Sequence, residues 1–438
     1  MRRPQLFRSF RVWLTPGISI KRWLLVLMLG ITMISLGLAY LLRALYLAGP
    51  YPKFVYWLTL QFLPHAVRAI LFGAAGIALG VWGFVKLNES LLAPFTTPDE
   101  DVATQVYHHR RRGRGPRVVC IGGGTGMPSV LRGIKAYTDN ITAVVTVADD
   151  GGSSGRLRRE MGLLPPGDFR NNLAALSEVE EITRRLFQYR FPEGTGLRGH
   201  AFGNLYLAAM AGVTGSFEQG LLMSNRVLAV RGRVLPSTLE LVQLLADVED
   251  DEGRIERIYG ESLIPKLGRG KRIRQVYLEP DDPPAYPESI KAILNADMII
   301  AGPGSLYTSV MPNLLVPGIA EALRASRALK VYVCNIATQP GETDGYDVDD
   351  HIMALERHVG RNLFQYVLAN DVFPTSPPPG GASEWVVLPR QKHGSYRLVT
   401  TSLQDSQRPW RHDPQKMARA LMDLFGQHTG RSVRHALR

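Results

Sequence analysis

Short apolar segments that end in glycine-rich loops recur in the second part of this 438-residue chain, and they limit its fold most strongly. The first is residues 118–121, followed by a loop with four glycines and then by Pro128 and apolar residues at helical spacing. Such a loop presents backbone N–H groups and the positive end of a helix to an anion. A diphosphate site is therefore predicted at Gly122, Gly123, Gly124, Thr125 and Gly126.

The glycine spacing of this loop differs from the G-x-G-x-x-G dinucleotide fingerprint, which argues against a nicotinamide dehydrogenase. A second apolar run, residues 141–148, ends in Asp149, Asp150, Gly151, Gly152 and Ser153. An acid at the end of a second strand often accepts hydrogen bonds from a ribose. Two acids would repel a diphosphate. We therefore expect one to accept hydrogen bonds from hydroxyl groups, and the other to bind a divalent cation, cap a helix or face solvent.

Two further polar segments precede predicted helices. Asp168 is a candidate N-cap as well as a functional residue, and Arg170 and Asn171 would lie in an exposed first turn as a phosphate clamp. His200 and Asn204 stand at the entry of a helix rich in small residues. A lone histidine is more often structural than catalytic, and His200 is kept as a lower-ranked candidate because adjacent glycines permit close approach of a ligand.

Two later apolar runs, residues 298–301 and 331–334, also end in small hydrogen-bonding residues. These are Gly302, Gly304, Ser305, Tyr307, Thr308 and Asn313 after the first, and Asn335 and Thr338 after the second. Several strands with such ends imply one crevice along the carboxyl edge of a parallel sheet. The predicted fold class is α/β, with a Rossmann-like doubly wound, mainly parallel sheet.

Other segments complete the predicted organisation of this part. Residues 239–280 read as short antiparallel strands with charged turns, residues 384–389 and 396–403 as late strands, and residues 414–425 as a terminal helix. Cys120 and Cys334 each end an apolar run and are expected to be buried thiols in a reducing cytosol rather than a disulfide.

The N-terminal part has the pattern of a membrane hairpin. Residues 23–42 and 69–85 carry no charge, and the first run has the length that a bilayer core requires. A signal peptide is the alternative for the first run, which is too long for one. Six basic residues precede the first run and five arginines lie at 110–117. Because basic residues favour the cytoplasmic side, both chain ends and the globular part are predicted to be cytoplasmic. The protein is predicted to be a multi-pass protein of the plasma or inner membrane.

Charge is concentrated in the same N-terminal part. Residues 1–117 carry a net charge of +11 out of the formal +12, which leaves +1 for residues 118–438. A nearly neutral globular part argues against nucleic-acid binding, and the basic linker suits an anionic lipid surface. The predicted organisation is a membrane hairpin over residues 1–90, a basic and proline-containing linker over 91–116, and a cytosolic domain over 117–438.

Six ordered motifs carry a family resemblance. They are IGGGTG, ADDGGSSGRLR, PPGDFRNNL, GHAFGNL, AGPGSLYTSVMPNLLVPGI and NIATQPGETDGY. Together they resemble the YvcK gluconeogenesis-factor family, a branch of the CofD-like group, over residues 117–370. The forms DDGGSSG and PPGDFRN are similar to the YvcK branch rather than to the CofD branch.

The resemblance implies a Rossmann-like protein that binds UDP-sugars, such as UDP-N-acetylglucosamine or UDP-glucose, and is needed for cell shape and gluconeogenic growth. It implies no catalytic residue for this branch. The CofD branch implies the alternative, a magnesium-dependent transferase with a nucleotide-activated donor. There, one acid would pair with Asp168 around the cation and His200 would assist proton transfer. Magnesium is the one cofactor that this alternative implies, and the sequence is compatible with a homo-oligomer.

Overall fold

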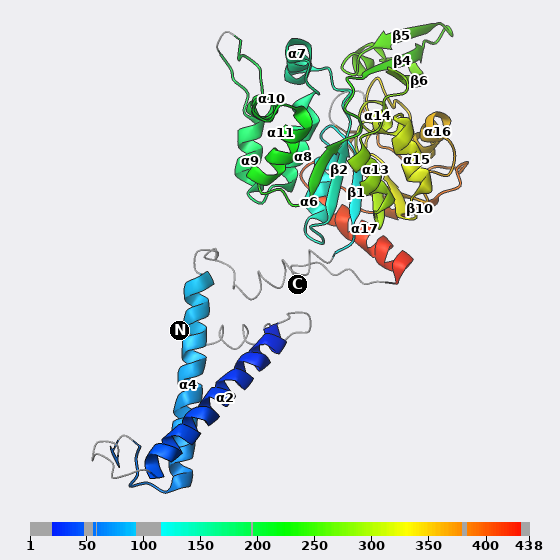
Figure 1. The fold of residues 1–438 in the computed structure, drawn as a ribbon. Helices are drawn as coiled ribbons and strands as arrows, with labels where there is room; N and C mark the ends of the chain where they lie inside the picture. Colours follow the sequence, from blue (N-terminus) through cyan, green and yellow to red (C-terminus); the bar gives the residue numbers. More distant parts are fainter. Residues whose placement is uncertain are drawn as a thin grey trace. The chain divides into compact units, whose positions relative to one another are not determined.

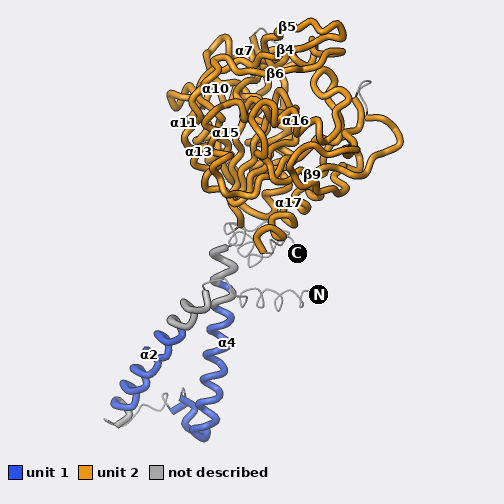
Figure 2. The backbone as a smooth tube through the Cα atoms, turned by 90° about the vertical axis from the view of Figure 1, so that its right-hand side faces the viewer, with its two compact units in different colours: residues 1–110 blue, residues 111–438 orange. Residues whose placement is uncertain are grey.

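The computed structural model describes residues 20–47, 56–57, 59–92, 115–193, 196–378 and 383–430. The chain forms two compact units, residues 1–110 and residues 111–438, which Figure 2 distinguishes by colour. The boundary between them falls inside the predicted linker.

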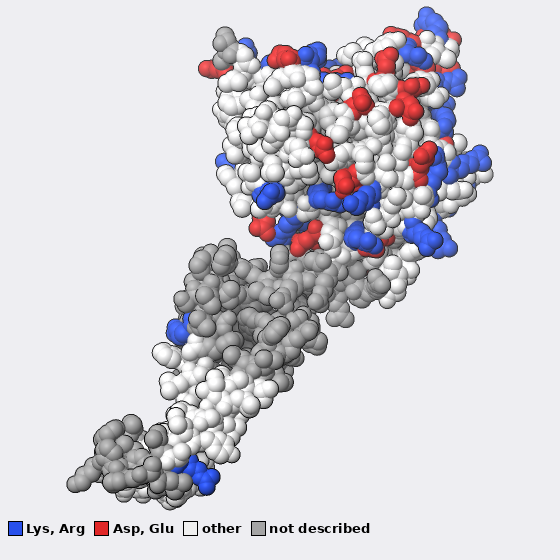
Figure 3. Space-filling view, in the orientation of Figure 1, with Lys and Arg blue, Asp and Glu red and all other residues white. Residues whose placement is uncertain are grey.

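The first unit contains two long helices, α2 (Ile20–Leu47) and α4 (His65–Leu92), which include both predicted membrane segments. Within α4, His65–Gly83 has a mean hydropathy of 1.7 and no buried side chain. Among the described residues it is the one helix that is long and apolar enough to cross a bilayer, because the apolar stretch Met28–Ala44 of α2 is shorter. Figure 3 shows few charged side chains on the described surface of these helices.

The second unit is built on a parallel seven-stranded sheet with the strand order β10-β9-β8-β7-β1-β2-β3 (Figure 1). Its strands are β1 (Val118–Gly122), β2 (Ile141–Val145), β3 (Arg233–Pro236), β7 (Met298–Ala301), β8 (Leu329–Val333), β9 (Tyr366–Asn370) and β10 (Arg397–Thr401). Every residue of β1, β2, β7 and β8 is buried, and their sequences are apolar except for Thr142 in β2 and Lys330 in β8. The buried Lys330 Nζ donates to the Ser326 carbonyl at 2.7 Å.

Helices connect and cover these strands. They are α6 (Met127–Ile134), α7 (Gly152–Met161), α8 (Pro166–Leu176), α9 (Glu180–Gln188), α10 (Phe202–Thr214), α11 (Phe217–Val227), α13 (Pro287–Leu294), the π-helix η2 (Leu306–Val310), α14 (Met311–Leu314), α15 (Pro317–Ala325), α16 (Val348–Val359) and α17 (Pro414–Thr429). Helices α6, α8 and α17 pack together, and α13 packs on α15. Because right-handed crossovers lead from β1 to β2 in one direction and from β7 to β8 in the other, these two groups cover opposite faces.

The strand order reverses between β1 and β7, which are adjacent in the sheet although 180 residues separate Val118 from its partner Met298. In doubly wound sheets ligands bind beyond the carboxyl ends of the strands at such a reversal. A ligand site is therefore expected at the loops that follow β1, β2, β7 and β8.

A small antiparallel subdomain is inserted between β3 and β7. It consists of β4 (Gln243–Glu249), β5 (Ile255–Tyr259), the single helical turn α12 (Ile264–Leu267) and β6 (Arg272–Glu279), with the order β5-β4-β6. Basic and acidic side chains alternate on its surface (Figure 3), and they include the ion pair of Arg257 with Asp247. The antiparallel strands expected within residues 239–280 are confirmed.

Of three other sequence predictions, two are confirmed and one is wrong. Residues 298–301 form β7 as predicted, and the terminal helix begins at Pro414 as predicted. Residues 384–389 do not form a strand, because Trp385 makes only an isolated bridge to Ala337. The backbone of residues 384 and 386 instead forms hydrogen bonds with residues 338 and 336, which follow β8.

Candidate functional site

The loops after β1 and β7 touch each other at the carboxyl edge of the sheet. A Cβ atom on Gly126 would lie 2.3 Å from the carbonyl oxygen of Pro303, so only glycine permits this approach. Gly124 has φ +62, a left-handed conformation that favours glycine. Thr125 is exposed at the tip of the loop. The predicted diphosphate loop is thus held by backbone packing and leaves its tip open.

Polar side chains from the loop after β8 hold the second of these loops in place. Gly304 donates its N–H to Asn335 Oδ1 at 3.0 Å, and Asn335 Nδ2 donates to the Gly304 carbonyl at 2.8 Å. Gln339 Nε2 donates to Ser305 Oγ at 2.6 Å. We call residues 122–126, 302–305, 335 and 339 the packed wall, because their polar groups are largely paired with one another.

Four predicted ligand-binding residues lie behind the packed wall rather than on it. Tyr307 is fully buried with its hydroxyl 2.8 Å from Tyr346 Oη, and Asn313 donates to the Gly122 carbonyl at 3.0 Å. Thr308 and Thr338 are also buried; Thr308 bonds Glu342, and Thr338 bonds the backbone of residue 384. The structure assigns these four residues a supporting position.

The loop after β2 faces the packed wall and carries the two adjacent acids. Asp149 Oδ1 accepts the Gly151 N–H at 2.9 Å, and burial raises the pKa of Asp149. Asp150 Oδ1 accepts the N–H of Ser262 at 2.9 Å, which ties this loop to the antiparallel subdomain. The two acids therefore have different roles: Asp150 joins two parts of the domain, and Asp149 faces the crevice side of α8, where a Cβ on Gly167 would lie 2.8 Å from its Oδ2.

Helix α8 places Asp168 and Arg170 differently from the sequence prediction. The N-cap is Pro165, and Asp168 lies in the first turn without capping the helix. Its carboxylate instead lies against the glycine loop, since a Cβ on Gly123 would be 2.4 Å from Oδ2. Burial and the nearby charge of Asp149 raise the pKa of Asp168 to about 7.

Arg170 is buried, with 6% of its surface exposed, and not in an exposed turn as predicted. Its Nη2 donates to Asn171 Oδ1 at 3.2 Å, while Nε and Nη1 have no hydrogen-bond partner among the described residues. The Cγ and Cδ atoms of Arg170 pack directly against Gly203, where an added Cβ would lie only 2.6 and 2.8 Å from them. Burial lowers its pKa, and Asp168 and Asp149 oppose that shift. A buried guanidinium with free N–H groups is a group prepared for an anion.

The starts of α7 and α10 meet beside Arg170. Ser153 Oγ accepts from Asn204 Nδ2 at 3.0 Å and lies 3.0 Å from His200 Nδ1. Since Ser153 also accepts the N–H of Ala201 at 3.4 Å, its own hydrogen is left for His200 Nδ1. Burial lowers the pKa of His200, so a neutral imidazole fits this network. We call residues 149–153, 168–171 and 200–204 the charged wall.

Two acids that the sequence prediction missed complete the crevice. Glu342 is 5% exposed, and burial raises its pKa to about 7; its Oε2 has no partner among the described residues. Glu261 follows β5, and burial together with the charges of Asp149, Asp168, Asp150 and Glu342 raises its pKa to about 9. Glu342 belongs to the motif NIATQPGETDGY, whereas only the glycine before Glu261 resembles the other strand ends.

These raised pKa values resolve the apparent conflict between acids and an anion site. Burial and mutual repulsion raise the pKa of Glu261, Asp168 and Glu342, so these carboxyl groups carry less negative charge at neutral pH than their number suggests. In the described part of the chain, no three Asp, Glu, His or Cys side chains group as metal ligands.

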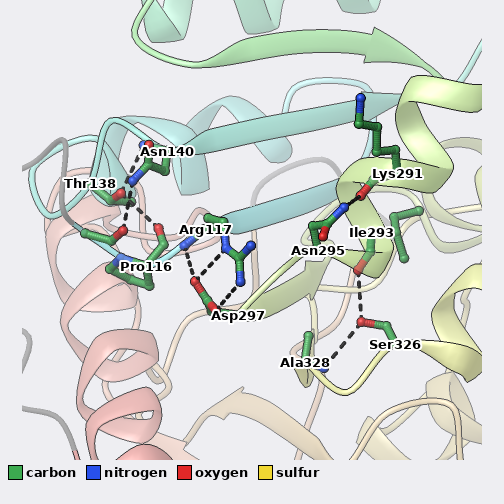
Figure 4. A network of polar contacts seen from close by, with 11 residues as sticks. Pro116, Arg117, Thr138, Asn140, Lys291, Ile293, Asn295, Asp297, Ser326 and Ala328 are labelled. Carbon is green, nitrogen blue, oxygen red and sulfur yellow. Dashed lines mark hydrogen bonds and ion pairs between the residues drawn. The ribbon is translucent and has the colours of Figure 1, made fainter.

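A cavity of about 540 Å³ lies at the opposite, amino edge of the sheet, near the starts of β1, β7 and β8. Arg117 and Asp297 at its rim form a two-bond ion pair, with Nη2 to Oδ1 at 2.8 Å and Nε to Oδ2 at 3.1 Å (Figure 4). Neighbouring polar groups in Figure 4, such as Ser326 and the Ile293 carbonyl, likewise bond each other. We place the functional site at the carboxyl edge, because the unpaired buried polar groups of Arg170, Asn204 and Glu342 lie there.

Comparison with known proteins agrees with this architecture. The profile of the family described as 2-phospho-L-lactate transferase CofD matches residues 118–428. A Nostoc sp. protein, whose name of gluconeogenesis factor is provisional, is 46% identical over 434 residues, covering 94% of this chain and 92% of that protein. The Bacillus subtilis gluconeogenesis factor is 51% identical over 258 residues, covering 59% of this chain and 80% of that protein.

The crystal structure of a UPF0052 family member from Bacillus halodurans has the same fold. It superposes with a TM-score of 0.65 at 45% identity, covering 70% of this chain and 99% of that one. A protein that consists almost wholly of the α/β domain indicates that this domain folds on its own. The chain belongs to the CofD family and, within it, groups with the gluconeogenesis factors.

Proposed function

We propose that the crevice binds a UDP-sugar of the UDP-N-acetylglucosamine type and that the protein is a regulator rather than an enzyme. The observation that carries the proposal is Arg170, a buried guanidinium whose Nε and Nη1 have no partner among the described residues. The next residue, Asn171, donates its Nδ2 to the Gly124 carbonyl of the glycine loop at 3.4 Å. The glycine loop with Thr125 supplies backbone donors for the diphosphate. Asp149 and Asn204 offer acceptors for the hydroxyl groups of ribose and sugar.

The regulatory role rests on the relatives. The Bacillus subtilis relative carries the name gluconeogenesis factor, and the motif forms are those of the YvcK branch. We therefore propose that ligand occupancy of the crevice affects gluconeogenic growth and cell shape. Deletion of the gene is expected to impair growth on gluconeogenic carbon and to alter cell shape, and a chain with Arg170→Ala is expected not to restore either.

Membrane tethering is the second part of the proposal. It is supported by the exposed apolar stretch His65–Gly83 and by the basic residues before α2 and at positions 110–117. The full chain is expected to stay with the membrane fraction after carbonate extraction, whereas residues 115–438 are expected to be soluble. Protease added outside spheroplasts should leave the α/β domain intact; its digestion would contradict the cytoplasmic orientation.

The direct test is a titration of residues 115–438 with UDP-N-acetylglucosamine, with and without magnesium, followed by mass spectrometry of the recovered nucleotide. Binding without magnesium and recovery of intact UDP-sugar are expected. UDP-glucose in a parallel titration reports the sugar preference. Failure to bind either nucleotide sugar would contradict the proposal.

A transferase is the second candidate, favoured by the match of residues 118–428 to the family described as 2-phospho-L-lactate transferase CofD. It would use a nucleotide-activated donor and transfer a phospho-containing group to an acceptor. Release of UDP or UMP in the same experiment, only when magnesium and an acceptor are added, would replace the regulatory proposal by this one.

A further inference from the structure

We propose that the cavity at the amino edge of the parallel sheet binds the headgroup of an anionic phospholipid. Its volume is about 540 Å³, and its lining comes from the starts of β1, β7 and β8 and from the last turns of α13 and α17. Small-molecule sites commonly have volumes of roughly 300–1,000 Å³. The cavity lies at the edge opposite the nucleotide crevice, so the inference does not depend on the proposed UDP-sugar.

The cavity combines an apolar floor with a basic rim. Leu329 and Phe425 in its lining are buried, and Leu294 is half-exposed. Arg327 and His428 in the same lining are exposed. A phospholipid matches both parts, because its phosphate can approach the cations while its glycerol and first methylene groups contact the apolar side chains. An inorganic anion would use the rim alone.

The acid in the cavity is already neutralised. Among the described residues that line it, Asp297 is the one carboxylate, and Figure 4 shows its ion pair with Arg117. Asp297 Oδ2 also accepts the backbone N–H of Arg117 at 2.8 Å. Since this pair carries no net charge, the charge that the cavity offers to a ligand is that of Arg327, and it is positive.

Arg327 belongs to a turn that hydrogen bonds hold in place. Ser326 Oγ donates to the Ile293 carbonyl at 2.9 Å, and the Ala328 N–H donates to Ser326 Oγ at 3.3 Å (Figure 4). Arg327 itself forms no hydrogen bond or ion pair with the described residues. The fold therefore fixes the backbone of this arginine beside the cavity and leaves its guanidinium available to an anion.

Other basic side chains near this turn have structural partners. Arg324 donates to the Val359 carbonyl, and Lys330 Nζ donates to the Ser326 carbonyl. Such bonds are common where the last turns of helices present unpaired carbonyl groups. Arg327 departs from this pattern, because it lines the cavity without bonding a carbonyl.

Both segments of the chain that lead away from the domain begin at this cavity, and both are basic. The linker joins the domain at residue 115, just before Arg117, and carries arginines at 110, 111, 112 and 114. Residues 431–438 follow Thr429, which lines the cavity, and carry three arginines. Residues 102–117 and 431–438 contain no acid. Clustered basic residues are attracted to an anionic lipid surface, which favours a lipid over a soluble anion.

Vesicle flotation of residues 115–438 tests the proposal, because this fragment lacks α2, α4 and the four linker arginines. The vesicles contain phosphatidylcholine alone or mixed with an equal amount of phosphatidylglycerol. Arg327→Ala removes the cation, and Leu294→Gln removes apolar surface without changing the charge. Arg361→Ala is the matched control, since Arg361 is an exposed arginine before β9 at the same edge and does not line the cavity. Circular dichroism checks that each variant is folded.

The natural fragment is expected to bind the vesicles with phosphatidylglycerol, to leave those of phosphatidylcholine alone unbound, and to be released by high salt. Such peripheral binding is compatible with the expected solubility of this fragment after carbonate extraction. Arg327→Ala should weaken vesicle binding roughly fivefold. Leu294→Gln should weaken it about threefold. Arg361→Ala should weaken it by less than about twofold, because salt screens a charge outside the cavity.

Equal binding to both kinds of vesicle, or binding to neither, would overturn the proposal. So would a loss in Arg361→Ala as large as that in Arg327→Ala, which would reduce the effect to general surface charge. Unchanged binding of Leu294→Gln would remove the lipid from the cavity floor. Isothermal titration with inorganic phosphate and glycerol 3-phosphate distinguishes the source of the anion: binding of either one without vesicle binding would replace the lipid by a soluble ligand.

Discussion

The two walls of the crevice differ in whether their polar groups are paired with one another. In the packed wall, Asn335 and Gln339 pair with the loop after β7, and Gly126 lies against Pro303 without room for a side chain. In the charged wall, Arg170 and Asn204 have buried polar atoms without a hydrogen-bond partner among the described residues. Burial also raises the pKa of Asp168 in this wall to about 7. The difference teaches that one wall fixes the position of backbone donors and that the other holds the groups which a ligand would satisfy.

The largest expected effect breaks the charged wall. Arg170→Ala is expected to weaken UDP-sugar binding by about 2–5 kcal/mol, because it removes the buried cation opposite the diphosphate. Isothermal titration of residues 115–438 measures this loss. Arg185→Ala, an exposed position on α9, serves as the control and should leave affinity unchanged. Equal affinities of the Arg170 variant and the natural domain would remove Arg170 from the site.

A smaller effect is expected from the packed wall, and on stability. Gly126→Ala should lower the free energy of unfolding by about 1–3 kcal/mol, since its Cβ would overlap the Pro303 carbonyl. Gly212→Ala in α10 is the control with the opposite sign, because its Cβ meets no atom within 4 Å. It should stabilise the domain by roughly 0.5–1 kcal/mol. Urea unfolding of both variants tests the pair, and a destabilising Gly212→Ala would contradict it.

The raised pKa values of Asp168 and Glu342 make the free energy of unfolding depend on pH. Burial raises the pKa of Asp168 and Glu342 to about 7 from ordinary values near 4, so between pH 4 and 7 the folded domain binds protons that the unfolded chain has lost. The free energy of unfolding without ligand should therefore fall as pH rises through this range. Glu342→Gln cannot ionise and should reduce the fall between pH 5 and 8 by about 1–3 kcal/mol.

Urea unfolding at pH 5, 6.5 and 8 measures this slope in both proteins. Glu356→Gln, at an incompletely buried position on α16, is the control and should keep the natural slope. An unchanged slope in Glu342→Gln would mean that Glu342 is ionised in the folded crevice at every pH tested.

The smallest effect concerns the tip of the packed wall. Thr125 is exposed, so Thr125→Ala should change the free energy of unfolding by less than about 0.5 kcal/mol. If its hydroxyl contacts the diphosphate, binding should weaken by about 0.5–1.5 kcal/mol. Isothermal titration with Thr125→Ser, which keeps the hydroxyl, separates loss of this contact from a change in the loop; equal weakening in both variants would refute the contact.

The sequence predicted the sheet and the packed wall better than the charged wall. Short continuous apolar runs bounded by glycines, such as residues 298–301, are typical of buried parallel strands, and the glycines that follow them mark close backbone approach. The state of Arg170 was not readable, because its burial depends on Gly203 from another helix. Glu261 was missed for a similar reason: its place depends on how the inserted subdomain docks through Asp150 and Ser262. Pairing across long sequence separations is not encoded in a local pattern.

The pairing of β1 with β7 has a consequence for the order in which the protein is made. Val118 must wait for Met298, and at about 5–20 residues per second the ribosome needs roughly 10–35 s to synthesise the chain between them. During that time the apolar edge of β1 has no neighbour on this side. The loops after β1 and β7, which meet at the carboxyl edge of the sheet, therefore cannot come together until more than half of the α/β domain has been synthesised.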